Sequence, residues 1–239
     1  MSTGVEGRDD ASFRARHAWP APLTGTTCGS PGSTTTLTGA PAQSGLATGC
    51  YTYVLTGVDN AGNTTSVSTV VQVRPRVTAL ALTNGTGTAG RIDAGDQVVI
   101  TFTDPIAVAS ACSTWSGDGS DQSLTADSDV TVTATNGGAG NDTVSVSAGS
   151  CTLNVGSLNL GSTAYTTANV TFGGVGAAKS TVAWNVGARQ LTITLGSPSG
   201  AGVATVASST PVFTPAAGLT TSSTTPITAP FTGANARQF

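Results

Sequence analysis

Short runs in which apolar and polar residues alternate are the feature that most limits how this chain can fold. Tyr51, Tyr53 and Leu55 alternate with Thr52, Val54 and Thr56. Similar runs cover residues 77–82, 98–103, 130–134, 144–148, 170–172, 182–186 and 191–195. Alternation with a period of two places successive side chains on opposite faces of a half-buried strand. Because Gly, Asn, Ser and Asp separate these runs, the pattern predicts an all-β protein of two packed antiparallel sheets.

Composition excludes two classes of partner. Charged residues make up 9% of the chain, against about a quarter in an average soluble domain. Its net charge is -3 and Lys179 is its one lysine, whereas a nucleic-acid interface requires a basic face. No apolar stretch approaches the roughly 20 residues that a spanning helix needs. We therefore expect no nucleic-acid partner and no membrane span.

The four cysteines indicate disulfides. Cys28, Cys50, Cys112 and Cys151 form no C-x-x-C pair, and a zinc site would require ligands at clustered spacings. Four cysteines allow three connectivities. We favour Cys28–Cys50 and Cys112–Cys151, because each pair brackets its own block of strands, and four buried free thiols are the alternative. Disulfides persist in oxidising compartments, so we predict an extracellular or cell-surface location.

Four segments are predicted along the chain. Residues 1–27 form an unstructured leader, because Pro20, Pro22 and Gly25 discourage regular structure. Residues 28–75 contain a hairpin whose turn is the Asp-Asn-Ala-Gly-Asn run at 59–63. Residues 76–231 form the main sandwich after an Arg-Pro-Arg linker, and residues 232–239 are a tail. The first 16 residues hold six charges and no apolar signal segment, so we expect an incomplete chain.

Two stretches resemble bacterial surface modules. The run 50–63, with its Tyr-x-Tyr strand and Asp-x-x-Gly-Asn turn, resembles the last two strands of bacterial immunoglobulin-like (Ig-like) and fibronectin-III-like modules. Residues 91–106 are similar to the opening of S-layer-type Ig-like domains of large actinobacterial surface proteins, a likeness that extends over about 76–231. The resemblance implies an Ig-like antiparallel β-sandwich, with a partial Ig-like unit on its N-terminal side.

The same resemblance implies a function. Such families supply non-catalytic structural or adhesion modules of secreted or cell-wall-associated proteins. The implied partners are other modules of the same surface protein and a cell-wall or host-surface ligand. An enzyme is not expected, because nucleophilic triads require a well-placed histidine and His17, the one histidine, falls in the predicted leader.

Carbohydrate binding and calcium binding are the alternative functions. Trp115 lies close to Asp118 and Asp121, and an exposed aromatic there would stack on a sugar ring. The two carboxylates would suit a glycosidase only if they flanked the glycosidic bond. We expect no required cofactor, but calcium is the one metal that these loops suit, through oxygen ligands from Asp118 and Asp121.

A second calcium hypothesis concerns Asp142. Residues 137–145 fit one copy of the nonapeptide G-G-x-G-x-D-x-U-x, which resembles an RTX calcium repeat and would make Asp142 a ligand. A glycine-rich hairpin turn between the runs 130–134 and 144–148 explains the same residues, and we favour the turn. A further candidate for a calcium site is a module junction with oxygen ligands from Asp93, Asp96 and Asp104.

Overall fold

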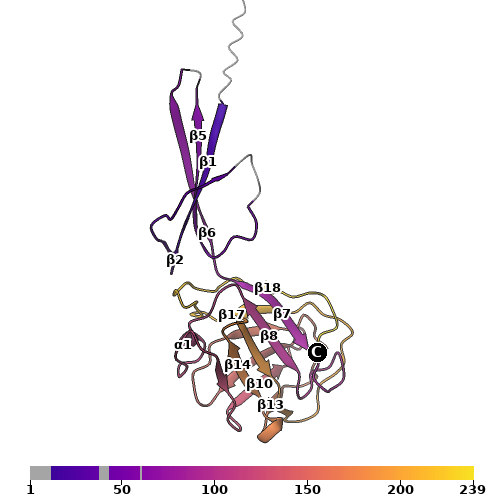
Figure 1. Cartoon of the computed structure of the whole chain (residues 1–239). Helices are drawn as coiled ribbons and strands as arrows, with labels where there is room; N and C mark the ends of the chain where they lie inside the picture. The colour runs from indigo at the N-terminus through magenta and orange to yellow at the C-terminus, as the bar shows by residue number, and fades with distance from the viewer. Residues whose placement is uncertain (1–11, 38–42, 60) are drawn as a thin grey trace, which may run out of the picture. The chain divides into compact units, whose positions relative to one another are not determined.

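The computed structural model describes residues 12–37, 43–59 and 61–239, and it divides into two compact units between Arg74 and Pro75 (Figure 1). We refer to residues 1–74 as the N-terminal unit and to residues 75–239 as the C-terminal unit. The division falls within the predicted Arg-Pro-Arg linker.

The N-terminal unit contains one four-stranded antiparallel sheet and a short two-stranded ladder. The sheet has the order β4-β1-β5-β6. Its strands are β1 (Ser12–Ala21), β4 (Thr35–Leu37), β5 (Gly49–Val58) and β6 (Thr64–Val73), and the ladder joins β2 (Leu23–Thr24) to β3 (Thr27–Cys28). The predicted hairpin is confirmed, because β5 and β6 pair in continuous register from Gly49↔Val73 to Val58↔Thr64.

The leader prediction is wrong for residues 12–27. Strand β1, which includes His17, pairs with β5 over nearly its whole length and with β4 only from Arg16 to Ala18. Pro20 therefore lies beyond the β4 ladder, where β1 has one neighbour and a missing N–H is tolerated. The part of this prediction that covers residues 1–11 lies outside the described residues.

The described side chains of the N-terminal unit form a very small core. Within this described part, the cluster of buried apolar residues consists of Ala21, Leu23 and Cys50, with the half-buried Cys28 packed against them. The Cys28–Cys50 disulfide joins β3 to β5 and is part of this core, with its Cα atoms 5.7 Å apart. Six consecutive residues of β5, from Tyr51 to Thr56, are only half-buried.

The C-terminal unit consists of two larger antiparallel sheets. The seven-stranded sheet has the order β16-β13-β10-β11-β12-β17-β18, and the five-stranded sheet has the order β7-β8-β15-β14-β9. Their strands are β7 (Val77–Thr83), β8 (Gln97–Phe102), β9 (Gln122–Leu124), β10 (Val130–Thr135), β11 (Thr143–Ala148), β12 (Gly156–Asn159), β13 (Val170–Gly173), β14 (Thr181–Asn185), β15 (Gln190–Thr194), β16 (Ser197–Pro198), β17 (Val212–Pro215) and β18 (Phe231–Thr232). Two short helices, α1 (Val108–Ala111) and the 3-10 helix η1 (Gly176–Ala178), complete the unit.

These two sheets share one apolar core, which confirms the all-β prediction and is consistent with a β-sandwich. Along β8, Val98, Ile100 and Phe102 are buried while the residues between them are half-exposed. Strand β10 follows the same pattern. One small cavity is lined from both sheets, by Ile100 and Ile193 on one side and by Leu158 and Phe213 on the other.

The predicted tail, residues 232–239, is part of this core. Phe239 is buried and packs edge-on against Tyr165. Its backbone N–H donates to the carbonyl of Leu82, and its carbonyl oxygen accepts from the N–H of Gly90. This role could not be predicted from the sequence, because residues 233–239 have no strand periodicity and Phe239 is held by partners far away in the chain.

Candidate functional site

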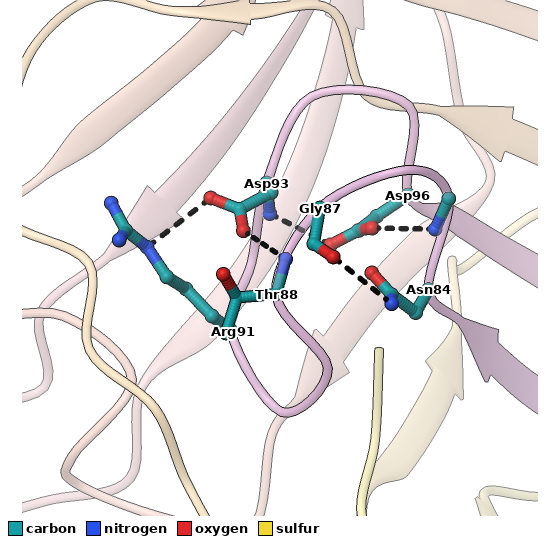
Figure 2. A network of polar contacts seen from close by, with 7 residues as sticks. Asn84, Gly87, Thr88, Arg91, Asp93 and Asp96 are labelled. Atoms are coloured by element: carbon teal, nitrogen blue, oxygen red, sulfur yellow. Dashed lines mark hydrogen bonds and ion pairs between the residues drawn. The ribbon is translucent and has the colours of Figure 1, made fainter.

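The loop between β7 and β8 is built around two aspartates (Figure 2). The buried Asp96 carboxylate accepts the backbone N–H of Gly85 at 2.9 Å and that of Asp93 at 2.7 Å. Asp93 accepts the N–H of Thr88 at 2.9 Å and forms an ion pair with Arg91 at 3.2 Å. Both carboxylates therefore bind their own loop.

Close backbone packing explains why glycines stand in this loop. A Cβ at Gly85 would collide with the backbone carbonyl of Gly95, and one at Gly87 would come within 2.6 Å of Cβ of Asp93. Asn84 adds a weak hydrogen bond to the carbonyl of Gly87 at 3.4 Å. The loop is a compact, internally bonded element.

Burial raises the pKa of Asp96 above its ordinary value of 3.8, although the N–H groups of Gly85 and Asp93 oppose the shift; the negative charge of Asp93 adds to it. When the pKa of a carboxyl is higher in the folded than in the unfolded state, the free energy of unfolding falls as pH rises between the two pKa values. Below pH 3.8 this group is protonated in both states.

We therefore expect Asp96→Asn to change how stability depends on pH. The free energy of unfolding of the wild type minus that of D96N should fall as pH rises through the window above 3.8, and then level off. Urea unfolding at a series of pH values measures this difference. For Asp127→Asn the same difference should rise with pH, in the window below 3.8, because a hydrogen bond from Lys179 lowers the pKa of Asp127. Identical slopes for the two variants would contradict the expectation.

Asp142 fastens a second loop. The side chain is buried, and its carboxylate accepts the backbone N–H of Gly137 and that of Thr166, both at 2.9 Å. Residues 137–140 form a turn, closed by the N–H of Gly140 on the carbonyl of Gly137, within the hairpin of β10 and β11. The structure thus has the hairpin turn that we favoured over a calcium repeat.

Asp118 and Asp121 serve different elements. Asp118 accepts the N–H of Val108, the first residue of α1, at 2.9 Å. Asp121 is exposed and accepts the N–H of Val186, just after β14, at 2.8 Å. Neither the glycosidase pair nor the shared calcium site of Asp118 and Asp121 gains support. In the described part of the chain, no three His, Cys, Asp or Glu side chains form a group that could hold a metal ion.

Trp115 does not fit the predicted sugar platform. Its side chain is 6% exposed and belongs to the core of the C-terminal unit. Trp115 lies three residues after Cys112 of the Cys112–Cys151 disulfide, whose Cα atoms are 5.7 Å apart, and its backbone N–H donates to the carbonyl of Cys112. A buried ring offers no face for stacking, so the structure supports a core role for Trp115, which the sequence also favours, over the alternative of ligand binding.

The most exposed apolar surface lies on β6 instead. Val67, Val70 and Val71 are 69%, 56% and 43% exposed. Among the residues that the structure describes, β6 lies at the edge of its sheet and pairs with β5 alone (Figure 1). The sequence does not reveal this surface, because an alternating strand gives no sign of whether it will be central or at an edge.

No model of a protein family matches the chain, and neither a curated protein nor a solved structure matches it. Among the residues that the structure describes, no helix is long and apolar enough to cross a membrane. Both favoured disulfides, Cys28–Cys50 and Cys112–Cys151, are present.

Proposed function

We propose that this chain is a non-catalytic, Ig-like structural or adhesion module of a secreted or cell-wall-associated bacterial protein. The observation that carries the proposal is the use of the carboxylates. Asp96 and Asp142 each accept two backbone N–H groups, and Asp118 accepts one. A general acid or base must reach its substrate's proton, whereas these side chains hold loops in place.

The Ig-like part of the proposal is supported by the β5–β6 hairpin. Its turn is organised by Asp59, which accepts the N–H groups of Ala61 and Asn63 at 2.9 and 2.8 Å and the side-chain amide of Asn63 at 2.7 Å. This is the Asp-x-x-Gly-Asn turn on which the resemblance to bacterial Ig-like modules depends. The antiparallel sheets of the C-terminal unit are compatible with an Ig-like module.

The location is supported by the disulfides. Four of four cysteines are paired, and such bridges persist in oxidising surroundings and are rare in the cytosol. A protein at the cell surface would meet the partners that the module class implies, namely neighbouring modules and a cell-wall or host ligand.

Surface labelling of intact producing cells tests this proposal. An antibody against the chain should label intact cells as strongly as permeabilised ones, and denatured natively produced protein should show no reactive thiols before reduction. Permeabilisation by itself does not alter the epitope in a surface protein, so the ratio of the two signals is the readout. Labelling only after permeabilisation, together with four reactive thiols, would overturn the proposal.

A further inference from the structure

Strand β6 lacks the devices by which proteins protect an exposed edge. Natural edge strands carry charges, prolines or bulges that prevent pairing with another chain. The ten residues Thr64–Val73 contain only Thr, Ser, Val and Gln, and their pairing with β5 has no bulge. Nine of the ten residues are exposed. The free side of β6 is therefore an open template for another strand.

Exposed apolar side chains are concentrated on this strand. The described residues contain four large, strongly exposed apolar side chains, and three of them belong to β6, namely Val67, Val70 and Val71. By register, Val67 and Val71 stand opposite Leu55 and Tyr51 of β5, on one face of the sheet. Exposed apolar patches of this kind mark interaction surfaces.

The charges at the two ends of β6 select a second copy in antiparallel orientation as the partner. The strand itself is uncharged, but the turn before it carries the Asp59 carboxylate and Arg74 follows its last residue. The side chain of Asn63 donates to Asp59 and so lowers its pKa, which keeps this carboxylate ionised. Antiparallel pairing of two copies places each Arg74 at the end where the other copy has Asp59, and parallel pairing would bring like charges together.

Side-chain register is also compatible with self-pairing. A two-fold axis normal to the sheet pairs residues on the same face, and an axis at Thr69 sets Val67 of each copy opposite Val71 of the other. Side chains that stand directly opposite each other on one face of an antiparallel pair pack together and stabilise the pairing. Strand β6 contains no charged side chain, so antiparallel pairing of two β6 strands places no like charges opposite each other.

We propose that two copies of this chain associate through β6, pairing antiparallel so that the four strands of each N-terminal unit join into one continuous sheet. The proposal goes beyond the function proposed above and does not depend on it. Surface location is read from cell labelling, whereas the edge pairing is read from the oligomeric state of the purified protein.

Sedimentation velocity of the full, disulfide-intact chain over a wide range of concentration tests the pairing. The wild type should form a dimer, and Val67→Lys with Val71→Lys should weaken dimerisation about tenfold or more, because charges on an edge oppose strand addition. Val175→Lys is the matched control, since Val175 is 61% exposed and lies in the C-terminal unit. Circular dichroism verifies that the variants stay folded.

A charge exchange tests the orientation. Arg74→Glu should weaken the dimer by placing like charges at each end, and adding Ala61→Lys to the exposed turn should restore part of the loss. A wild type that stays monomeric at every concentration would overturn the proposal. So would a dimer that keeps its affinity in the V67K/V71K variant, or one that Val175→Lys disrupts equally.

Discussion

Replacing Cys28 and Cys50 by serine is expected to unfold the N-terminal unit while the C-terminal unit stays folded. The bridge closes a sequence separation of 22 residues, which corresponds to about 3 kcal/mol in the chain-entropy account. Among the side chains that the structure describes in this unit, the buried apolar cluster consists only of Ala21, Leu23 and Cys50, so the bridge accounts for much of its core. The half-buried side chains of β5 gain only part of the stabilisation that full burial would give.

Hydrogen exchange followed by mass spectrometry measures this result within a single molecule. Amides of residues 49–73 should lose their protection in the C28S/C50S variant, because β5 and β6 would no longer be tied to β3. Amides of residues 130–148 provide the internal control, since β10 and β11 belong to the larger core. Unchanged protection over 49–73 would show that the sheet is stable without its bridge.

Asp142→Ala is expected to destabilise the C-terminal unit by roughly 2–6 kcal/mol. The substitution removes the acceptor of two backbone N–H groups, those of Gly137 and Thr166. Each buried donor left unpaired costs about 1–3 kcal/mol. Because Gly137 lies in the β10–β11 turn and Thr166 lies between β12 and β13, the same loss weakens the connection between two loops, which the side chain of Asn136 also joins by donating to the carbonyl of Thr166.

Urea unfolding followed by tryptophan fluorescence measures this loss, with Asp121→Ala as the matched control. Asp121 is exposed and accepts one backbone N–H, so its removal should cost less than about 1 kcal/mol. Equal effects of the two substitutions would contradict the role assigned to Asp142. An Asp142→Ala loss that appears only when calcium is added would instead identify Asp142 as a metal ligand.

Prediction from the sequence worked best where alternation is regular. Strands β8, β10 and β15 were predicted because a period of two is a local property of the chain and their buried residues recur at every second position. Strand β1 was missed, because Pro20 and the charged Arg14 and Arg16 obscure the pattern. Strand β9 was missed because three residues are too short to show a period.

The roles of the candidate site residues could not be predicted from the sequence, because they depend on contacts between segments that are far apart in the chain. Residue type suggested that Trp115 could stack on a ligand and that Asp118, Asp121 and Asp142 could bind an ion. The ring of Trp115 is instead buried in the core, and each of the three carboxylates accepts a backbone N–H from another segment of the chain. Asp121 binds Val186 across 65 residues, and Asp142 binds Thr166 across 24. Local sequence carries no record of such contacts.

The sequence by itself determined the all-β class, the β5–β6 hairpin and a preference for the two disulfides that the structure contains. These follow from periodicity, turn chemistry and cysteine spacing, which act over short stretches of chain. Only the tertiary structure decided that Phe239 is core, that each candidate carboxylate accepts a backbone N–H and that β6 is left at an edge. Burial and edge position depend on which distant segments pack together, and short-range patterns do not specify that.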